Sequence, residues 1–287
     1  MIHKLITAPV RFYRMALLAM REAEVVASLL ARNRLDKLLA QELGRTPKRL
    51  AAYGFKAFSQ SDEDGIIQEI FCRIGTTSKC FIEIGCGDGL ENNTHLLLLS
   101  GWTGLWVDGS PQSVAAARRY HAGAILRGSL TAHCCTITTE NVDQTLSSLC
   151  RVEEVDLLSI DIDGNDYWIW SALSCVRPRV VVIEYNAALR PPLSLVQSYR
   201  SNAQWDHTNF FGAGLAALEK LAASKGYSLV GCNLAGVNAF FVRNDCLHET
   251  FSGPFTAHSQ YMPPNYDLFA HTLRHAHPPG AGDYVNV

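Results

Sequence analysis

The 287-residue sequence predicts an α/β fold: a doubly wound, mostly parallel sheet that finishes with an antiparallel hairpin. Three observations lead to this prediction. From residue 80 onward, short apolar segments alternate with amphipathic ones. Two of the apolar segments, "VDLLSI" and "RVVVIEY", are apolar on both faces, as in a sheet that is covered on both sides. Only five residues separate "YSLVGC" from "NAFFVR", too few for a parallel crossover, so these two form a hairpin.

Each element follows from its own pattern. We expect strands at residues 80–84, 104–108, 123–127, 155–160 and 179–184, and helices near residues 93–100, 111–121, 141–150 and 165–174. A further helix at 211–225 leads into the hairpin, which brings the sheet to seven strands. Apolar spacing over residues 10–43 predicts one long helix or a broken pair. The chain then divides into a helical extension at 1–56, the sheet domain at 57–246 and an irregular tail at 247–287.

The composition is that of an ordinary globular protein, with 48% apolar and 18% charged residues. A net charge of −2 gives no basic excess, so we expect no nucleic-acid partner. The charge is uneven, because residues 1–56 hold eleven Lys and Arg against four Asp and Glu. The arginine-rich polar face of the N-terminal helix is typical of a packing or dimerisation helix. It is also typical of a helix that attaches to an anionic membrane surface, and both alternatives stay open.

The nine cysteines include no C-x-x-C pair, and several lie inside apolar, strand-like segments. This pattern is typical of reduced thiols and predicts a cytoplasmic protein, peripheral at the inner membrane surface if the extension binds lipid. Arg11 and Arg14 interrupt the apolar residues near the N-terminus, so we expect no secretory signal there. No apolar run reaches the ~20 residues that span a bilayer.

A glycine loop follows the first predicted strand, in "FIEIGCGDGLENNTHLLLL". Gly85, Gly87 and Gly89 form G-x-G-x-G between a strand and a helix, where glycine permits a tight turn and close approach of a ligand. The dinucleotide fingerprint needs a small residue at position 90, which is Leu90, so a nicotinamide-dependent oxidoreductase is disfavoured. Glu83, two places before the loop, is unusual beside a pyrophosphate but suits a ligand that carries positive charge.

Asp108 ends the second predicted strand, 23 residues after Gly85. A carboxylate at this place accepts hydrogen bonds from ribose hydroxyls in dinucleotide sites. The loop, Glu83, Asp108 and the terminal hairpin together predict a nucleoside cofactor at the carboxyl edge of the sheet.

The segment "FIEIGCGDG" resembles the first motif of the class I S-adenosylmethionine-dependent methyltransferases, whose seven-stranded, Rossmann-like sheet ends in an antiparallel strand. More narrowly, residues 57–245 are similar to the FkbM-type methyltransferases. The segments that carry this similarity are "FSQSDEDGIIQEIF", "EIGCGDGLENNT", "GWTGLWVDGS", "DIDGNDYWIW", "VVVIEYN" and "GVNAFFVR".

The resemblance implies S-adenosyl-L-methionine as cofactor and O-methylation of a saccharide or a similar polyhydroxylated small molecule. It places Glu83, Gly85 and Gly87 along the amino-acid part of the cofactor, Asp108 at the ribose and Ser129 on the adenine side. A non-catalytic binding or scaffold protein that keeps the fold is the alternative from another class.

Three aspartates follow the fourth predicted strand in "SIDIDGNDYW". An EF-hand is excluded, because counting from Asp161 puts Ala172 where the glutamate of position 12 belongs. Asp166 falls in the first turn of a helix, which favours a structural role. Asp161 lies next to the predicted cofactor cleft and, with Asp163, faces the active-site edge of the sheet.

Glu184 and Asn186, which end the next strand, belong beside these aspartates. Two mechanisms stay open for the proton of an acceptor hydroxyl. In one, Asp163 or Glu184 takes it directly; in the other, Asp161, Glu184 and Asn186 hold Mg²⁺ or Ca²⁺.

Weaker signals lie outside these motifs. The resemblance makes Gln60 and Asp64 candidates for the open side of the cofactor, although an N-cap role would explain Asp64 as well. His207 lies in a loop where a substrate lid belongs. His271 and His275 are four residues apart and would share a helix face, where charges at a helix end explain them more simply than a metal does.

Overall fold

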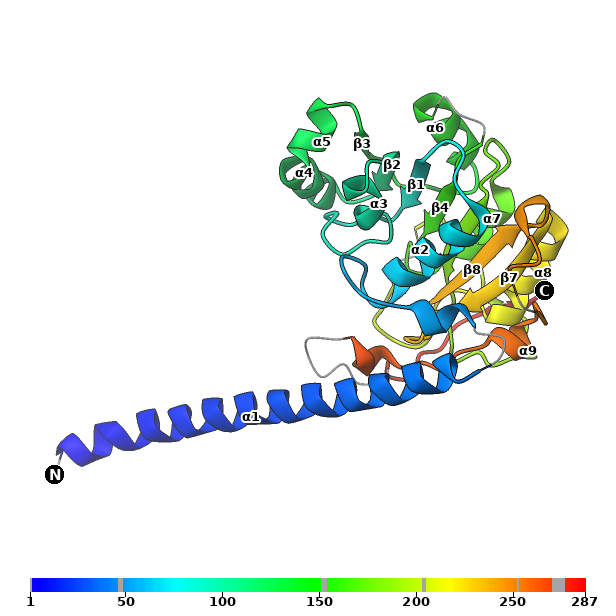
Figure 1. The fold of residues 1–287 in the computed structure, drawn as a ribbon. Coiled ribbons are helices and arrows are strands. Elements are labelled where there is room, and N and C mark those ends of the chain that lie inside the picture. Colours follow the sequence, from blue (N-terminus) through cyan, green and yellow to red (C-terminus); the bar gives the residue numbers. More distant parts are fainter. Residues whose placement is uncertain (1, 46–48, 151–153, 203–204, 252, 270–276) are drawn as a thin grey trace.

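The computed structural model describes residues 2–45, 49–150, 154–202, 205–251, 253–269 and 277–287, with the backbone alone for residues 2–11. Its centre is a seven-stranded sheet of order β3-β2-β1-β4-β5-β8-β7 (Figure 1). β8 runs antiparallel to both of its neighbours, whereas the other neighbouring strands pair in parallel. The predicted doubly wound sheet with its terminal hairpin is therefore confirmed. The strands are β1 (Cys80–Ile84), β2 (Thr103–Asp108), β3 (Leu130–Cys134), β4 (Leu157–Ile160), β5 (Val180–Glu184), β7 (Tyr227–Cys232) and β8 (Asn238–Arg243).

Helices cover both faces of the sheet. One face packs against α2 (Glu63–Ile74), α3 (His95–Leu99), α4 (Pro111–Tyr120) and α5 (Ala122–Leu126). The other packs against α6 (Val142–Leu149), α7 (Asp166–Ala172) and α8 (Leu215–Lys225). Successive residues of β4 point to opposite faces, so that Leu157 joins the first core and Leu158 the second. This two-sided burial explains why "VDLLSI" is apolar throughout.

The predicted strand at 123–127 is wrong. Residues 123–126 lie in α5, and Leu126 is exposed to solvent. The third strand is the later segment "LTAHC", whose burial alternates because it lies at the edge of the sheet. A short apolar run does not by itself distinguish a strand from a helix, and here the half-buried edge strand carried the weaker signal.

The extension is a single long helix, α1 (Ile2–Leu43), which projects well beyond the sheet domain (Figure 1). Its C-terminal part packs on the domain through Leu35, Leu38 and Leu39, and Arg34 forms an ion pair of 2.9 Å with Asp267. Among the described helices, none is long and apolar enough to cross a membrane.

The tail is mostly irregular but contains short elements that lie on the domain. Its last strand, β9 (Tyr284–Asn286), pairs with β6 (Leu195–Gln197) in a small antiparallel sheet that the sequence pattern did not predict. The tail also contains α9 (Ala257–Gln260) and the 3₁₀ turn η3 (Tyr266–Leu268). Two further 3₁₀ turns, η1 (Leu50–Tyr53) and η2 (Asn244–Cys246), lie earlier in the chain.

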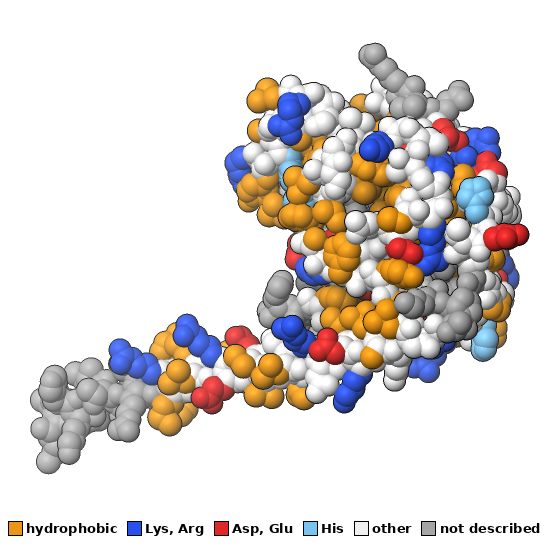
Figure 2. Space-filling model, viewed as in Figure 1, with side chains coloured by type: hydrophobic (Ala, Val, Ile, Leu, Met, Phe, Trp, Pro, Cys, Tyr) orange, Lys and Arg blue, Asp and Glu red, His pale blue; other side chains and the backbone are white. Residues whose placement is uncertain are grey.

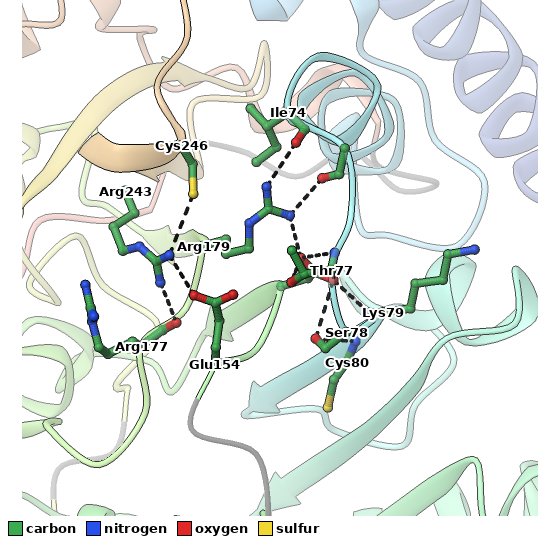
Figure 3. A network of polar contacts seen from close by, with 12 residues as sticks. Ile74, Thr77, Ser78, Lys79, Cys80, Glu154, Arg177, Arg179, Arg243 and Cys246 are labelled. Atoms are coloured by element: carbon green, nitrogen blue, oxygen red, sulfur yellow. Dashed lines mark hydrogen bonds and ion pairs between the residues drawn. The ribbon is translucent and has the colours of Figure 1, made fainter.

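A buried ion pair at the amino edge of the sheet joins three segments (Figure 3). Asp156, just before β4, accepts a hydrogen bond of 2.7 Å from Arg179, just before β5. The same carboxylate accepts the backbone N–H groups of Thr77 and Lys79, while Arg179 also donates to the carbonyl of Ile74. The end of α2 and the start of β1 are thereby fixed to the two central strands.

Replacing Asp156 by alanine is expected to lower the free energy of unfolding by about 3–5 kcal/mol, because it leaves the Arg179 guanidinium buried without its carboxylate. Urea denaturation of the purified variant measures this. Glu154→Ala is the matched control. Glu154 is about half exposed and Arg243 keeps its second ion pair, with Asp245, so the loss should cost less than about 1 kcal/mol. Equal costs for the two variants would contradict the assigned role of Asp156.

Candidate active site

A cavity of about 610 Å³ lies at the carboxyl edge of the parallel strands. Gly85 and Gly87 line it from the loop after β1, Asp108 from the end of β2, and Asp161 and Asp163 from the loop after β4. The structure therefore brings these five predicted residues to one place. This is the edge at which doubly wound sheets bind their ligands.

The loops after β1 and β4 touch through their backbones. Gly85 has φ of +89°, and a Cβ at this position would stand 1.6 Å from the carbonyl oxygen of Asp161. Gly87 has φ of +56° and open space where its Cβ would be. Its N–H donates to Asp108 Oδ2 at 2.8 Å, while Asp108 Oδ1 accepts the N–H of Ser110. Glycine at position 85 is thus required by close approach, and Asp108 holds two loops at the cavity wall.

Glu83 is buried, and both of its carboxylate oxygens accept hydrogen bonds from the residues that follow the glycine loop. It accepts hydrogen bonds from Asn92 Nδ2 at 2.6 Å, from the backbone N–H of Asn93 at 2.9 Å, and from Thr94 Oγ1 at 2.5 Å. Burial raises the pKa of Glu83, although these hydrogen bonds oppose the rise. Its role in shaping the loop was not predicted, and the signal for it was the polar run "ENNT" just after the loop.

A smaller cavity of about 230 Å³ shares Gln60, Gly85, Gly87 and Asp161 with the large one. Within the described part of the chain its lining residues include no lysine or arginine. The side-chain oxygens of Asn92 and Asn238 are buried without a hydrogen-bond partner. Carboxylates also line it, from Glu83, Asp88, Glu91 and Asp161, of which Glu91 is paired with Lys56. A wall of acceptors without cations suits a ligand with positive charge and N–H donors.

Three carboxylates converge beside the cavities: oxygen atoms of Asp161, Asp166 and Glu184 all lie within 4.8 Å of one another. Burial, and then the charge of Asp166, raises the pKa of Asp161 well above its ordinary value. Burial, and then the charge of Asp161, does the same to the pKa of Glu184. Burial raises the pKa of Asp166 to about 6. Glu184 Oε2 is buried without a hydrogen-bond partner.

The predicted structural role of Asp166 is confirmed, because its oxygens accept the N–H groups of Ile162 and Gly164. The prediction of Asn186 as a metal ligand is wrong. Its amide donates to the carbonyls of Asn209 and Phe211, and its oxygen accepts the N–H of Ala188. Asp166 takes its place as the third oxygen donor beside Asp161 and Glu184, and three carboxylates are a donor set that fits Mg²⁺ or Ca²⁺.

The position predicted for Ser129 is also wrong. Ser129 immediately precedes β3, at the amino edge of the sheet, where its hydroxyl donates to the carbonyl of Ala124. The error follows from the misplaced third strand. The residues that follow the true strand, Cys135, Thr136 and Ile137, line the large cavity instead.

An aromatic group stands at the mouth of the large cavity. Trp205 and His207 both line it, with ring centroids 4.7 Å apart, and the ring of Trp205 also lies 4.8 Å from that of His277. Asp163 lies near His207. Partial desolvation raises the pKa of Asp163, while the charge of His207 lowers it. Trp205 was not predicted, because no periodic pattern connects this loop to the sheet.

The structure places the weaker candidates differently. Gln60 lines both cavities. Asp64 instead accepts the backbone N–H groups of Ala57, Phe58 and Ser59, which is a structural role. The pair His271 and His275 lies outside the described residues.

Comparison with known proteins gives a likeness in structure and none in sequence. No family model matches the chain, and no curated protein matches it. Among solved structures it is similar to the magnesium protoporphyrin IX methyltransferase of Synechocystis PCC 6803 with bound SAM, at 13% identity and a TM-score of 0.41, over 76% of this chain and 97% of that one. The O-methyltransferase of Bacillus cereus in complex with SAH gives 18% identity and a TM-score of 0.43, over 74% and 88% of the two chains. With scores this low, a function has to be argued from the site.

The carboxylate cluster makes stability depend on pH. Because the folded pKa of Glu184 is raised above its ordinary 4.5, the folded state keeps a proton that the unfolded chain releases as pH rises past that value. Wild type therefore loses stability relative to Glu184→Gln with rising pH, and the variant's advantage should grow by at least about 1 kcal/mol between about pH 5 and pH 8. Urea denaturation at several pH values measures it, with exposed Glu249→Gln as control. An advantage that shrinks with pH would contradict the assignment.

Proposed function

We propose that this chain is an S-adenosyl-L-methionine-dependent methyltransferase that methylates a hydroxyl of a saccharide or similar polyhydroxylated acceptor. One observation carries the proposal: two cavities at the carboxyl edge of the sheet share lining residues and hold carboxylates, Glu83 and Asp161 among them, that no lysine or arginine among the described lining residues neutralises. A ligand with its own positive charge would relieve this cost. S-adenosylmethionine carries a sulfonium and an ammonium group against one carboxylate, and so is a net cation.

The residues present fit this cofactor. The acceptor-lined small cavity suits its amino group, and Asp108, at the end of β2, suits its ribose, since each carboxylate oxygen keeps a lone pair beyond its backbone hydrogen bond. Cys135, Thr136 and Ile137 line the part of the large cavity where the adenine base of the cofactor would lie. When bound, the cofactor supplies an electrophilic methyl group.

The proton of the acceptor hydroxyl would go to the carboxylate cluster. Asp161 is its best-placed member, because it lines both cavities, whereas Glu184 lies behind it and acts as a positioning residue. Asp163, at the mouth of the large cavity, is the alternative base. A divalent ion held by Asp161, Asp166 and Glu184 remains the alternative route to the same end.

The proposal of a saccharide acceptor is based on the family resemblance and on the side chains at the mouth of the large cavity. Trp205 presents a flat aromatic ring there, flanked by the polar side chains of Asp163, Ser201 and His207. An amphipathic sugar ring suits such a surface, with its C–H face against the indole and its hydroxyls toward the polar groups.

Calorimetric titration tests the cofactor. S-adenosylmethionine and its demethylated product should both bind the wild type, NAD should not, and Asp108→Ala should weaken binding at least tenfold because it removes the ribose acceptor. Ser129→Ala is the matched control and should bind as wild type does, since Ser129 lies at the other edge of the sheet. Binding of NAD alone would indicate an oxidoreductase, and binding of none of the three ligands a scaffold.

The cluster predicts that cofactor binding releases a proton. A cationic ligand lowers the raised pKa of Asp161 and Glu184, so affinity should rise with pH and up to about one proton should leave at neutral pH. Titrations in buffers of different ionisation enthalpy count the protons, and Glu184→Gln should reduce the number. Mg²⁺ that binds alone and is lost in Glu184→Gln would favour the metal-assisted route instead.

A further inference from the structure

The projecting part of α1 exposes more apolar surface than a soluble chain normally leaves uncovered (Figure 2). Large apolar side chains between residues 12 and 30 are 41% to 77% exposed. An isolated helix in water gains little from its own hydrogen bonds, so a helix of this length needs a partner to bury that surface. The side chains concerned are Phe12, Tyr13, Met15, Leu17, Leu18, Met20, Val25, Val26, Leu29 and Leu30.

A narrower seam runs within this surface. The residues Phe12, Ala16, Ala19, Ala23, Val26 and Leu30 follow one another at intervals of four, three, four, three and four. This is the a/d spacing of a coiled coil, and it contains no charged or polar residue. All six side chains are exposed. The seam lies on a different face from Leu35, Leu38 and Leu39, which pack on the sheet domain.

We propose that the seam binds a second copy of this chain, so that two α1 helices pair in an antiparallel dimer. The spacing reads the same in both directions about residue 21, so antiparallel pairing brings Phe12 opposite Leu30, Ala16 opposite Val26 and Ala19 opposite Ala23 of the partner. Bulky side chains then meet at both ends, and alanines let the helices approach closely at the centre. A parallel pair would stack three alanine layers between bulky ends of unequal size and leave a void.

The area available is what a dimer needs. At about 100 Å² for each large apolar side chain and half that for each alanine, the seam with its flanking Met15 and Met20 offers on the order of 600 Å² per helix. The pair would bury about 1,200 Å² in total, at the lower limit of stable interfaces. The dimer should therefore form at micromolar concentration and dissociate on dilution.

Charge argues for a protein partner and against an anionic membrane. Between residues 12 and 31, which include the whole seam, Arg14 and Arg21 are balanced by Glu22 and Glu24, so this segment carries no net charge. By helical geometry both glutamates fall within the wide apolar arc, where a helix lying on a membrane would have to bury them beside lipid. The alanines of the seam gain little from lipid but favour close helix packing.

Sedimentation velocity of the full chain over a concentration series tests the dimer. Wild type should pass from monomer to dimer, and Ala19→Arg should shift the midpoint at least tenfold toward monomer, because it places a charge at the centre of the seam. Ser28→Arg is the control and should dimerise as wild type does, since residue 28 lies on the opposite face with Arg14 and Arg21. Circular dichroism verifies that each variant is folded.

Cross-linking tests the direction. Mixed Ala19→Cys and Ala23→Cys chains should form a disulfide between the peptides that carry residues 19 and 23, identified by mass spectrometry after trypsin digestion. Links between two copies of position 19 would overturn the antiparallel arrangement. A wild type that stays monomeric at high concentration, or that floats as a monomer with anionic phosphatidylglycerol vesicles, would overturn the dimer.

Discussion

Buried negative charge at the carboxyl edge of the sheet is the constraint on which the site depends. Asp161 and Glu184 approach each other because β4 and β5 are neighbours, and one acid directly follows β4 while the other ends β5. Among the described residues, neither contacts an arginine or lysine, unlike Asp156 at the opposite edge, which Arg179 neutralises. The fold thus stabilises one edge with a complete ion pair and leaves the other with charge that a ligand must satisfy. That asymmetry separates the structural edge of the sheet from the candidate site.

The glycine loop makes this arrangement sterically possible. With a Cβ at position 85 the loop after β1 would overlap the backbone of Asp161, and the cavity would lose the wall that both loops form. Glu83 then fixes the far side of the loop through Asn92, Asn93 and Thr94. Loop shape and cavity charge therefore come from the same short segment. A substitution that changes only the packing of this loop would therefore also change the electrostatics of the site.

The sequence predicted the central strands well, because burial on both faces leaves a continuous apolar signal. It failed at β3, where exposure at the sheet edge weakens that signal, and the misplacement of Ser129 followed directly. It placed Asp161, Asp163 and Glu184 at one edge, since parallel strands end together. It did not reveal how Asn186 uses its amide, or that Trp205 reaches the cavity, because both depend on contacts between segments that no local pattern connects.

The same electrostatics link stability to binding. A carboxylate whose pKa is raised by burial weakens the unliganded protein at neutral pH, since it either keeps a proton or carries a desolvated charge. A cation removes that penalty by interacting with the charged form. The free energy that the unliganded protein loses at this site therefore contributes to the affinity for the cation. Ligands that share the shape of the cofactor but lack its positive charge would leave the penalty in place. Selectivity for a sulfonium over a neutral nucleoside would then come from the burial of Asp161 and Glu184, without a dedicated contact to the sulfur.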